Sequence, residues 1–440
     1  MKTSKTIIPI ILVAALCLAW FSFISGILDN HNAYRKCVND AEISIEEGLY
    51  EQAVEFYKES LKYKANKSTY MKIKETYDLL YAEEHTPFIR SLYIDDMALA
   101  AEAFPKNEEF WVAQIDLYME ALNYSKAYTT VNQAFNYGAQ GEKLDSLYRT
   151  LLYKIKIGYK LYTAFKTALN GYITVFDGSN WLVLDDYGKA ITSNYRFVGL
   201  ISDDGKGLYT NNIDSRFLDI TEVPRARFDL VFEEAGYFNE KSGLIPVKID
   251  GKWKYMNLDG EFLPGEFEVA GSYYNRKAVA KANNTWVLVD EEGKQDSLAA
   301  FDDIKFDLYG CHIQNDVIIA MTDGKYHLYD TEFNQIGDFE ADDIDIYIDP
   351  DGIAFESNGK WGFANSDGEI IVEPQYVQAK SFANGYAAVR NEDGLWGFIN
   401  RKYELVIDYQ FVDAYYFTQA ETCMVSSTEG IYQMIQFMFE

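Results

Sequence analysis

Basic residues are few in this chain of 440 residues, which has 40 lysines and arginines against 68 aspartates and glutamates, a formal net charge of −28. Contacts with nucleic-acid phosphates need a basic surface, and so does docking on anionic lipid headgroups. The composition therefore argues against both kinds of partner.

Histidine and cysteine are also scarce, with four residues of each type. No HExxH, G-x-S-x-G or phosphate-loop motif occurs in the chain. The cysteines are far apart and lack CxxC or Cys/His spacing, so we expect isolated thiols rather than disulfides or a metal site. They are Cys17, Cys37, Cys311 and Cys423. The sequence predicts no enzyme activity and no cofactor.

Proline is rare, with 8 residues, whereas tyrosine is abundant, with 35, and hydrophobic residues make up 48% of the chain. This composition excludes a disordered chain and leaves room for two or three domains, each with its own core. Residues 171–440 contain 47 acidic and 21 basic residues, whereas residues 1–170 contain 21 acidic and 19 basic residues. We infer a multidomain α plus β chain whose two folds meet near residue 170.

An uncharged apolar run of 22 residues, 7–28, follows the short basic N-terminus. As a helix it would be about 33 Å long, enough to cross a bilayer core of about 30 Å. It exceeds a signal-peptide core and lacks a small-residue cleavage site, so we expect an uncleaved transmembrane signal anchor, with cleavage as the alternative. Lys2 and Lys5 would keep residues 1–6 in the cytoplasm. The expectation is a single-pass cell-membrane protein whose C-terminal domains are extracytoplasmic.

Residues 33–168 show helical periodicity. Ala53, Tyr57 and Ser60 fall on one stripe, and Ala127 and Ala134 recur in a similar stripe further along. At these residues the chain resembles tetratricopeptide repeats, which are helix pairs of about 34 residues. We expect three imperfect repeats, because Tyr93 and Ile115 stand where small residues are usual, and then a closing helix over residues 143–168. Such an array would hold a peptide in its groove or serve as a spacer.

One sequence pattern recurs through the C-terminal part, most clearly from Trp361 and from Trp396. Asp-Gly or Asn-Gly pairs flank each copy and favour tight hairpins, and the strand between them alternates with aromatic residues on one face. The aromatic position recurs at Trp181, Trp253, Trp286, Tyr326, Trp361, Trp396 and Tyr432. A meander of this size cannot bury its aromatic face alone, so each copy must pack against the next one.

The pairs Trp361-Gly362 and Trp396-Gly397 resemble the WG-repeat family of bacterial β-repeat proteins over residues 171–440. In other copies the glycine is replaced, by Leu182, Lys254, Val287 or His327. The resemblance implies an all-β, β-propeller-like domain with an interaction role. We expect the segment 431–440 to close the ring by pairing with residues 171–176, with an open β-solenoid as the alternative.

The regular tryptophans are expected in the core rather than on sugar-stacking platforms. Aromatic residues outside the repeated position are freer to line a peptide or glycan groove. They are Tyr273, Tyr274, Tyr415 and Tyr416. The acidic run 342–351 breaks the calcium-loop pattern and is expected to form solvated turns.

The expected function is a membrane-anchored cell-surface scaffold that binds other proteins or peptides and catalyses no reaction. A glycan- or cell-wall-binding module or a wall-acting hydrolase is the second hypothesis. A structural spacer ectodomain is the third.

Overall fold

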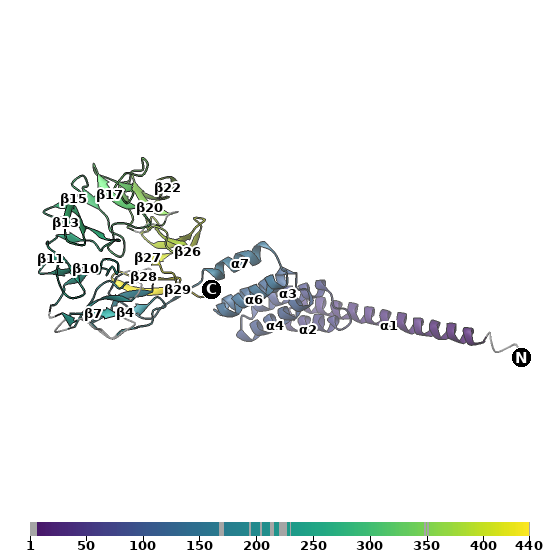
Figure 1. The fold of residues 1–440 in the computed structure, drawn as a ribbon. Coiled ribbons are helices and arrows are strands. Elements are labelled where there is room, and N and C mark those ends of the chain that lie inside the picture. Colours follow the sequence, from purple (N-terminus) through teal and green to yellow (C-terminus); the bar gives the residue numbers. More distant parts are fainter. Residues whose placement is uncertain are drawn as a thin grey trace. The chain divides into compact units, whose positions relative to one another are not determined.

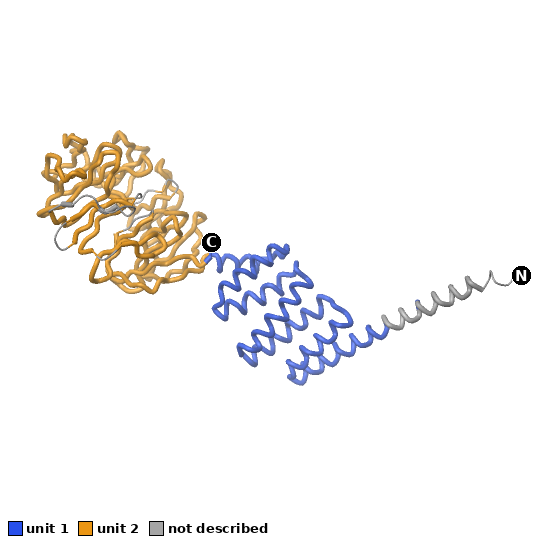
Figure 2. The backbone as a smooth tube through the Cα atoms, turned by 60° about the horizontal axis from the view of Figure 1, so that its bottom comes forward, with its two compact units in different colours: residues 1–152, 439 blue, residues 153–438, 440 orange. Residues whose placement is uncertain are grey.

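The structure is a computed structural model of the whole chain. It describes residues 7–166, 171–192, 195–202, 205–211, 215–219, 227–228, 230–346, 349 and 352–439. The chain divides into two compact units (Figure 2): a helical unit of residues 1–152 with Phe439, and a β-repeat unit of residues 153–438 with Glu440.

The junction lies earlier than the sequence suggested, since a closing helix was expected to reach residue 168. That helix ends at Leu152, and the chain then enters short strands of the β-repeat unit. The helices are α1 (Ile7–Glu46), α2 (Tyr50–Leu61), α3 (Lys67–Glu83), α4 (Pro87–Ala103), α5 (Glu108–Glu120), α6 (Tyr124–Asn136) and α7 (Glu142–Leu152).

No helix in the described part of the chain is long and apolar enough to cross a membrane. The transmembrane anchor expected at residues 7–28 is therefore wrong, and so is the single-pass membrane localisation that depended on it. The uncharged run is the first part of α1, one helix of 40 residues that continues through a charged segment to Glu46. The tail expected at residues 1–6 lies outside the described residues.

Successive helices form a layered array with a continuous core. The expected stripe is buried, because Ala53, Tyr57 and Ser60 in α2 and Ala127 and Ala134 in α6 are all in the core. Side-chain caps set the starts of α3, α4 and α6, and at α6 the Asn123 side chain accepts a hydrogen bond from the Lys126 amide. Asn66 accepts a hydrogen bond from the Thr69 amide, and Thr86 accepts one from the Ile89 amide just before Pro87 at the first turn.

Tyr93, at a position where a small residue is usual, is accommodated by another tyrosine. Its ring stacks on Tyr77 with centroids 4.8 Å apart. Its hydroxyl donates to Asp78 at 2.5 Å, and the Tyr77 hydroxyl donates to Asp96 at 2.7 Å. The ring pair packs between α3 and α4, so the array accommodates the large residue.

The β-repeat unit consists of small antiparallel sheets. The strands of the first four are β2 (Ala164–Lys166), β3 (Tyr172–Phe176) and β4 (Trp181–Asp185); β5 (Phe197–Val198), β6 (Lys206–Thr210), β7 (Ser215–Asp219) and β8 (Arg227–Phe228); β9 (Glu234–Ala235), β10 (Leu244–Ile249) and β11 (Lys252–Asn257); and β12 (Val269–Ala270), β13 (Lys277–Ala282), β14 (Thr285–Asp290) and β15 (Gln295–Ser297).

The next three sheets contain β16 (Asp303–Ile304), β17 (Ile318–Thr322) and β18 (Lys325–Tyr329); β19 (Asp343–Ile344), β20 (Ile353–Ser357), β21 (Lys360–Ala364) and β22 (Ile370–Tyr376); and β23 (Gln378–Ala379), β24 (Tyr386–Arg390), β25 (Trp396–Asn400) and β26 (Leu405–Phe411). The last sheet joins β27 (Asp413–Phe417), β28 (Thr422–Thr428) and β29 (Ile431–Phe437) to β1 (Ile155–Ile157).

This last sheet closes the unit, because its order is β1-β29-β28-β27. Ile155 pairs with Phe437 and Ile157 with Ile435, so the first strand of the unit pairs with the last. Figure 1 shows the sheets following one another around a ring, from β4 and β7 through β13 and β20 to β28 and β29. The open solenoid is thus wrong. The expected pairing of the C-terminal segment with residues 171–176 is also wrong, since β3 pairs with β2 and β4.

The glycine of the Trp-Gly pair has a steric cause. A Cβ atom on Gly362 would lie 2.4 Å from the Val372 carbonyl oxygen, and one on Gly397 would lie 2.6 Å from that of Ile407. In both sheets the fourth strand bulges toward the third, and the register shifts beside the tryptophan. Where valine replaces the glycine, at Val287, the fourth strand pairs in unbroken register.

The first strand of each sheet has a small or hydrophobic residue that points inward: Phe165, Val198, Ala235, Ala270, Ile304, Ile344, Ala379 or Ala414. Lys166 follows Phe165 as Lys305 follows Ile304 and Lys380 follows Ala379. It pairs with Thr174, two residues before Phe176, which is the partner of Trp181. The Lys166 ammonium lies 4.2 Å from the Phe197 ring centroid and donates to the Val198 carbonyl at 2.9 Å.

Replacing Lys166 with methionine is expected to stabilise the β-repeat unit by about 1–2 kcal/mol at pH 7, because a charge leaves the core. Burial lowers the pKa of Lys166 from 10.5 to about 8. The folded state therefore binds this proton more weakly than the unfolded state, so wild-type stability rises between pH 8 and pH 10.5 and the advantage of methionine shrinks over that range. Urea unfolding at pH 7 and pH 10 measures this difference. A constant difference would contradict the assignment.

Candidate functional site

In the first strand of each sheet, one residue directly follows the inward hydrophobic residue. The type of this following residue differs between parts of the ring. It is glycine in three consecutive sheets, at Gly199, Gly236 and Gly271. A Cβ atom there would lie within 3 Å of an atom of another sheet, such as Phe306 Cε1 at 2.6 Å from Gly271. In the β2-β3-β4 sheet the same position carries Lys166, which does not line the cavity described next. In the four sheets that follow Gly271 it carries the side chains of Lys305, Asp345, Lys380 and Tyr415.

These four side chains line one cavity of about 350 Å³, which we call the convergence pocket. Its lining is Lys305, Leu308, Asp343, Ile344, Asp345, Ile346, Trp361, Gln378, Ala379, Lys380, Tyr415 and Tyr416. Because equivalent positions of four consecutive sheets meet there, the pocket lies where these sheets converge. The repeat thus brings residues up to 111 positions apart, Lys305 and Tyr416, to one site.

Lys380 is the cation of the convergence pocket for which the described residues supply no counter-ion. Its ammonium lies 5.0, 5.5 and 5.7 Å from the ring centroids of Tyr415, Tyr416 and Trp396. In the described part of the chain this ammonium makes no hydrogen bond or ion pair. Three aromatic faces hold the charge in place without neutralising it, so the ammonium can bind an incoming anion.

The other charged groups of the pocket are occupied. Lys305 forms an ion pair with Asp343 and donates to the Ile344 carbonyl at 2.6 Å. Asp345 accepts hydrogen bonds from the Ser381 amide at 2.7 Å and from the Tyr416 hydroxyl at 2.7 and 2.8 Å. These bonds fix the Tyr416 ring beside Lys380.

Tyr415 is held in the same way by Asp413, which accepts from its hydroxyl at 2.7 Å. Burial, and then the hydrogen bond to Asp413, raise the pKa of Tyr415 well above its ordinary value. The phenol therefore stays protonated across the physiological range, and its ring keeps one orientation beside the ammonium.

The repeated aromatic residues divide by burial. Trp286, Tyr326, Trp361 and Trp396 are buried, whereas Trp181, Trp253 and Tyr432 are half-buried. All seven lie on strands, and the strand that carries Tyr432, β29, lies at the seam of the ring. Their placement inside or beside the sheet cores agrees with packing rather than with exposed sugar-stacking platforms.

The four aromatics expected in a groove do not meet at one site. Tyr415 and Tyr416 line the convergence pocket, where Trp361 joins them. Tyr273 is fully buried, and its hydroxyl donates to the Asp290 carbonyl at 2.9 Å, so it belongs to the core. Tyr274 is half-buried and lies 3.5 Å from Asp316 in a turn region.

Sequence reasoning missed both lysines of the pocket. An alignment of the copies could have found them. Several copies share a pattern in which an aromatic residue is followed by two variable residues and then by an aliphatic residue. In that frame the next residue is glycine in three copies and Lys305 or Lys380 in two others. At Lys305 and Lys380 this residue lines the cavity, whereas Lys166, which occupies the corresponding position after Phe165, does not.

Among the described residues no group of three or more histidine, cysteine, aspartate or glutamate side chains could hold a metal ion. Cys37, Cys311 and Cys423 are free thiols.

The family described as WG containing repeat matches residues 227–253, 361–395 and 396–420. Two of these segments begin at Trp361 and Trp396. The C-terminal unit is similar to WG-repeat proteins. No curated protein matches the chain.

Solved structures with similar folds include the C-terminal WD40 domain of Sif2, with 10% identity, a TM-score of 0.40, and coverage of 64% of this chain and 98% of that one. The WD40 β-propeller domain of Doa1 has 11% identity, a TM-score of 0.32, and coverage of 64% and 97%. Hsv2p of Kluyveromyces lactis has 11% identity, a TM-score of 0.37, and coverage of 55% and 94%. The ring architecture described above rests on the strand pairing alone.

Proposed function

We propose that this chain is a non-catalytic binding protein that holds a segment of a partner protein in the convergence pocket. The observation that carries the proposal is the half-buried Lys380 ammonium, enclosed by Tyr415, Tyr416 and Trp396 and without a counter-ion among the described residues. A carboxylate of the partner would complete the charge pair, and the aromatic rings would cover the neighbouring apolar part of the segment.

The state of the pocket carboxylates favours binding over the hydrolase alternative. Asp343 is paired with Lys305, and Asp345 holds Tyr416 and the Ser381 amide. An acid–base pair needs carboxyl groups that can exchange protons with a substrate. Here the carboxylates serve to orient the binding side chains.

The helical unit would add a second surface for the partner. Its helix pairs resemble tetratricopeptide units in the buried stripe that contains Ala53 and Tyr57, although Tyr93 departs from that pattern. Arrays of this kind present a continuous face to a peptide. A spacer role for the helical unit is the alternative.

Selection of peptides from a phage-displayed random library on the immobilised full chain tests the proposal. We expect selected peptides to carry a carboxylate and to lose about tenfold or more in affinity for a Lys380→Met variant, since a hydrogen bond to a charged group contributes about 1.5–3 kcal/mol. Fluorescence anisotropy measures both affinities.

Lys254→Met is the matched control. Lys254 is also half-buried and lies 5.9 Å from the Phe262 ring centroid, but it pairs with Glu266 and is not among the residues that line the pocket. Selected peptides should bind this variant as they bind the wild type. Equal binding to the Lys380 variant would refute the assigned site, and failure to select any peptide would refute the binding function.

A further inference from the structure

A second cavity, of about 390 Å³, is lined by lysines and, among the residues that the structure describes, by no carboxylate. We call it the seam pocket. Its lining is Lys156, Ile157, Gly158, Tyr159, Lys160, Tyr162, Leu184, Tyr187, Gly188, Lys189, Met434 and Gln436. This is unusual in a chain of net charge −28, where acidic side chains dominate the surface. A pocket that gathers three cations and no acid is complementary to an anionic ligand.

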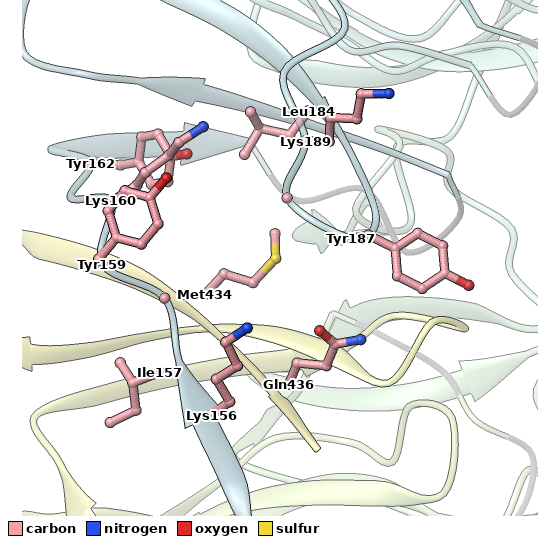
Figure 3. A pocket seen from close by; sticks show the side chains of 12 residues that line it. Lys156, Ile157, Tyr159, Lys160, Tyr162, Leu184, Tyr187, Lys189, Met434 and Gln436 are labelled. Carbon is pink, nitrogen blue, oxygen red and sulfur yellow. The ribbon is translucent and has the colours of Figure 1, made fainter. Parts of the chain in front are cut away.

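The seam pocket lies where the ring closes. One wall comes from β1 and the segment after it, the floor comes from β29, and the opposite wall comes from the turn after β4 (Figure 3). Direct bonds join these elements. The Gly158 amide donates to the Met434 carbonyl at 2.7 Å, and the Thr422 hydroxyl donates to the Asp186 carbonyl at 2.5 Å. The pocket therefore exists only while the two ends of the β-repeat unit are joined.

Two glycines give the seam pocket its depth. A Cβ atom on Gly158 would lie 3.1 Å from the Met434 carbonyl oxygen, and one on Gly188 would lie 2.9 Å from the Met434 sulfur. Gly188 also has a φ of +81°, which favours glycine. Met434 and the buried side chains of Leu184 and Tyr162 thus form an apolar floor between the two walls.

The rim of the pocket is cationic and aromatic. Tyr159 is 88% exposed and Tyr187 is 63% exposed, which is unusual for large aromatic side chains. Lys156, Lys160 and Lys189 are exposed and make no ion pair with the described residues. Residues 153–170, which supply Lys156 and Lys160, contain four lysines and no acidic residue.

One of the two acidic side chains beside the β4 turn, Asp185, serves the turn itself. Asp185 accepts hydrogen bonds from the amides of Tyr187 and Lys189 at 3.1 and 2.8 Å. Its carboxylate therefore shapes the turn that carries Lys189.

We propose that the seam pocket binds an acidic peptide segment in which an aromatic or aliphatic side chain stands between carboxylates. Figure 3 shows Lys156, Lys160 and Lys189 on different sides of Met434. One compact anion cannot reach all three, whereas carboxylates spread along a peptide can each meet one lysine. Lysine on a flexible stem suits separate carboxylates better than one bidentate anion. The central apolar side chain rests on Met434 between the rings of Tyr159 and Tyr187.

Because both ends of the ring contribute walls, an occupied seam pocket also holds the ring closed. A ligand that binds only the closed unit stabilises that unit in proportion to the logarithm of its free concentration once the site is nearly saturated. This site shares no residue with the convergence pocket and does not depend on the function proposed for it.

The probe is a fluorescein-labelled peptide, Glu-Glu-Phe-Glu-Glu, measured by fluorescence anisotropy with the full chain at about 0.15 M salt, where screening limits repulsion by the net negative charge of the chain. We expect saturable binding and a higher melting temperature of the β-repeat unit when the peptide is present. The triple variant Lys156→Gln, Lys160→Gln, Lys189→Gln should lose about tenfold or more in affinity.

The control variant removes the same charge elsewhere, through Lys252→Gln, Lys277→Gln and Lys402→Gln, three exposed lysines outside the pocket. It should bind within about twofold of the wild type. Two control peptides, Gln-Gln-Phe-Gln-Gln and Glu-Glu-Ala-Glu-Glu, should both bind more weakly than the probe.

The site is refuted if the probe does not bind, if the two triple variants bind it equally, or if the glutamine peptide binds as tightly as the probe. If inorganic phosphate competes with the probe and binds with equal affinity, the proposed peptide ligand is wrong and the site binds a simple anion. In a Lys380→Met background the triple variant must show the same loss of probe binding, so the test separates this site from the convergence pocket.

Discussion

Replacing Ile435 with aspartate is expected to unfold the β-repeat unit while the helical unit keeps its secondary structure. Ile435 is fully buried and lies in the central strand of the closing sheet, where it pairs with Ile157 on one side and Cys423 on the other. The substitution removes a large apolar side chain and places a carboxylate in the core without a partner. Together these changes cost more than about 4 kcal/mol, most of the stability of a typical domain.

Circular dichroism and scanning calorimetry of the full chain measure the effect. The calorimetric transition of the β-repeat unit should disappear or shift strongly downward, and the helical signal at 222 nm should remain. Ile431→Asp is the control, because Ile431 is half-buried at the start of the same strand. A similar small loss in both variants would show that β29 does not close the ring.

The ring closure illustrates where sequence reasoning reaches its limit. The recurrence at Trp361 and Trp396 predicts stacked meanders, and the tail that contains Tyr432 predicts a closing strand. Its partner cannot be found in the same way, because β1 has only three residues, Ile155–Ile157, and pairs with no strand that is adjacent to it in the sequence. Pairing between segments so far apart in the chain leaves no local pattern, so the sequence alone places this segment at the end of a helix.

The N-terminal run shows a similar limit. Its length and lack of charge suggest a membrane span, but no helix in the described part of the chain is long and apolar enough to cross a membrane. In the structure the run belongs to α1, whose later residues, including Ala41, enter the core of the helical array. Helix boundaries depend on tertiary packing that a window of hydropathy does not contain.

The sequence predicts only part of the candidate site. Tyr415 and Tyr416 are predicted because they fall outside the repeated aromatic position, and they line the convergence pocket. Tyr273 meets the same criterion but is buried, since both faces of these small sheets pack against neighbours. Lys380 is not predicted, because a single lysine in a strand is usually solvated. Only the fold shows that three rings surround it.

Replacing Gly397 with alanine is expected to destabilise the β-repeat unit by about 3 kcal/mol, the upper part of the range for overpacking. A methyl group there would lie 2.6 Å from the Ile407 carbonyl oxygen and 3.0 Å from the Tyr409 amide nitrogen. Both are backbone atoms of the bulged strand β26, so no side-chain rotation relieves the contact. The bulge must flatten, and the buried residue Phe411, which pairs with Trp396, must move with it.

Urea unfolding of the full chain measures the loss, with Gly359→Ala as the matched control. Gly359 has a φ of +78°, and no atom lies within 4 Å of the position that a methyl group would occupy, so alanine there costs only backbone strain of about 1 kcal/mol. A cost at Gly397 no greater than at Gly359 would mean that the bulge yields easily. The larger expected cost follows from the backbone contact, and it gives the Trp-Gly pair at Trp396 a physical basis: the backbone of β26 lies where a side chain at position 397 would stand.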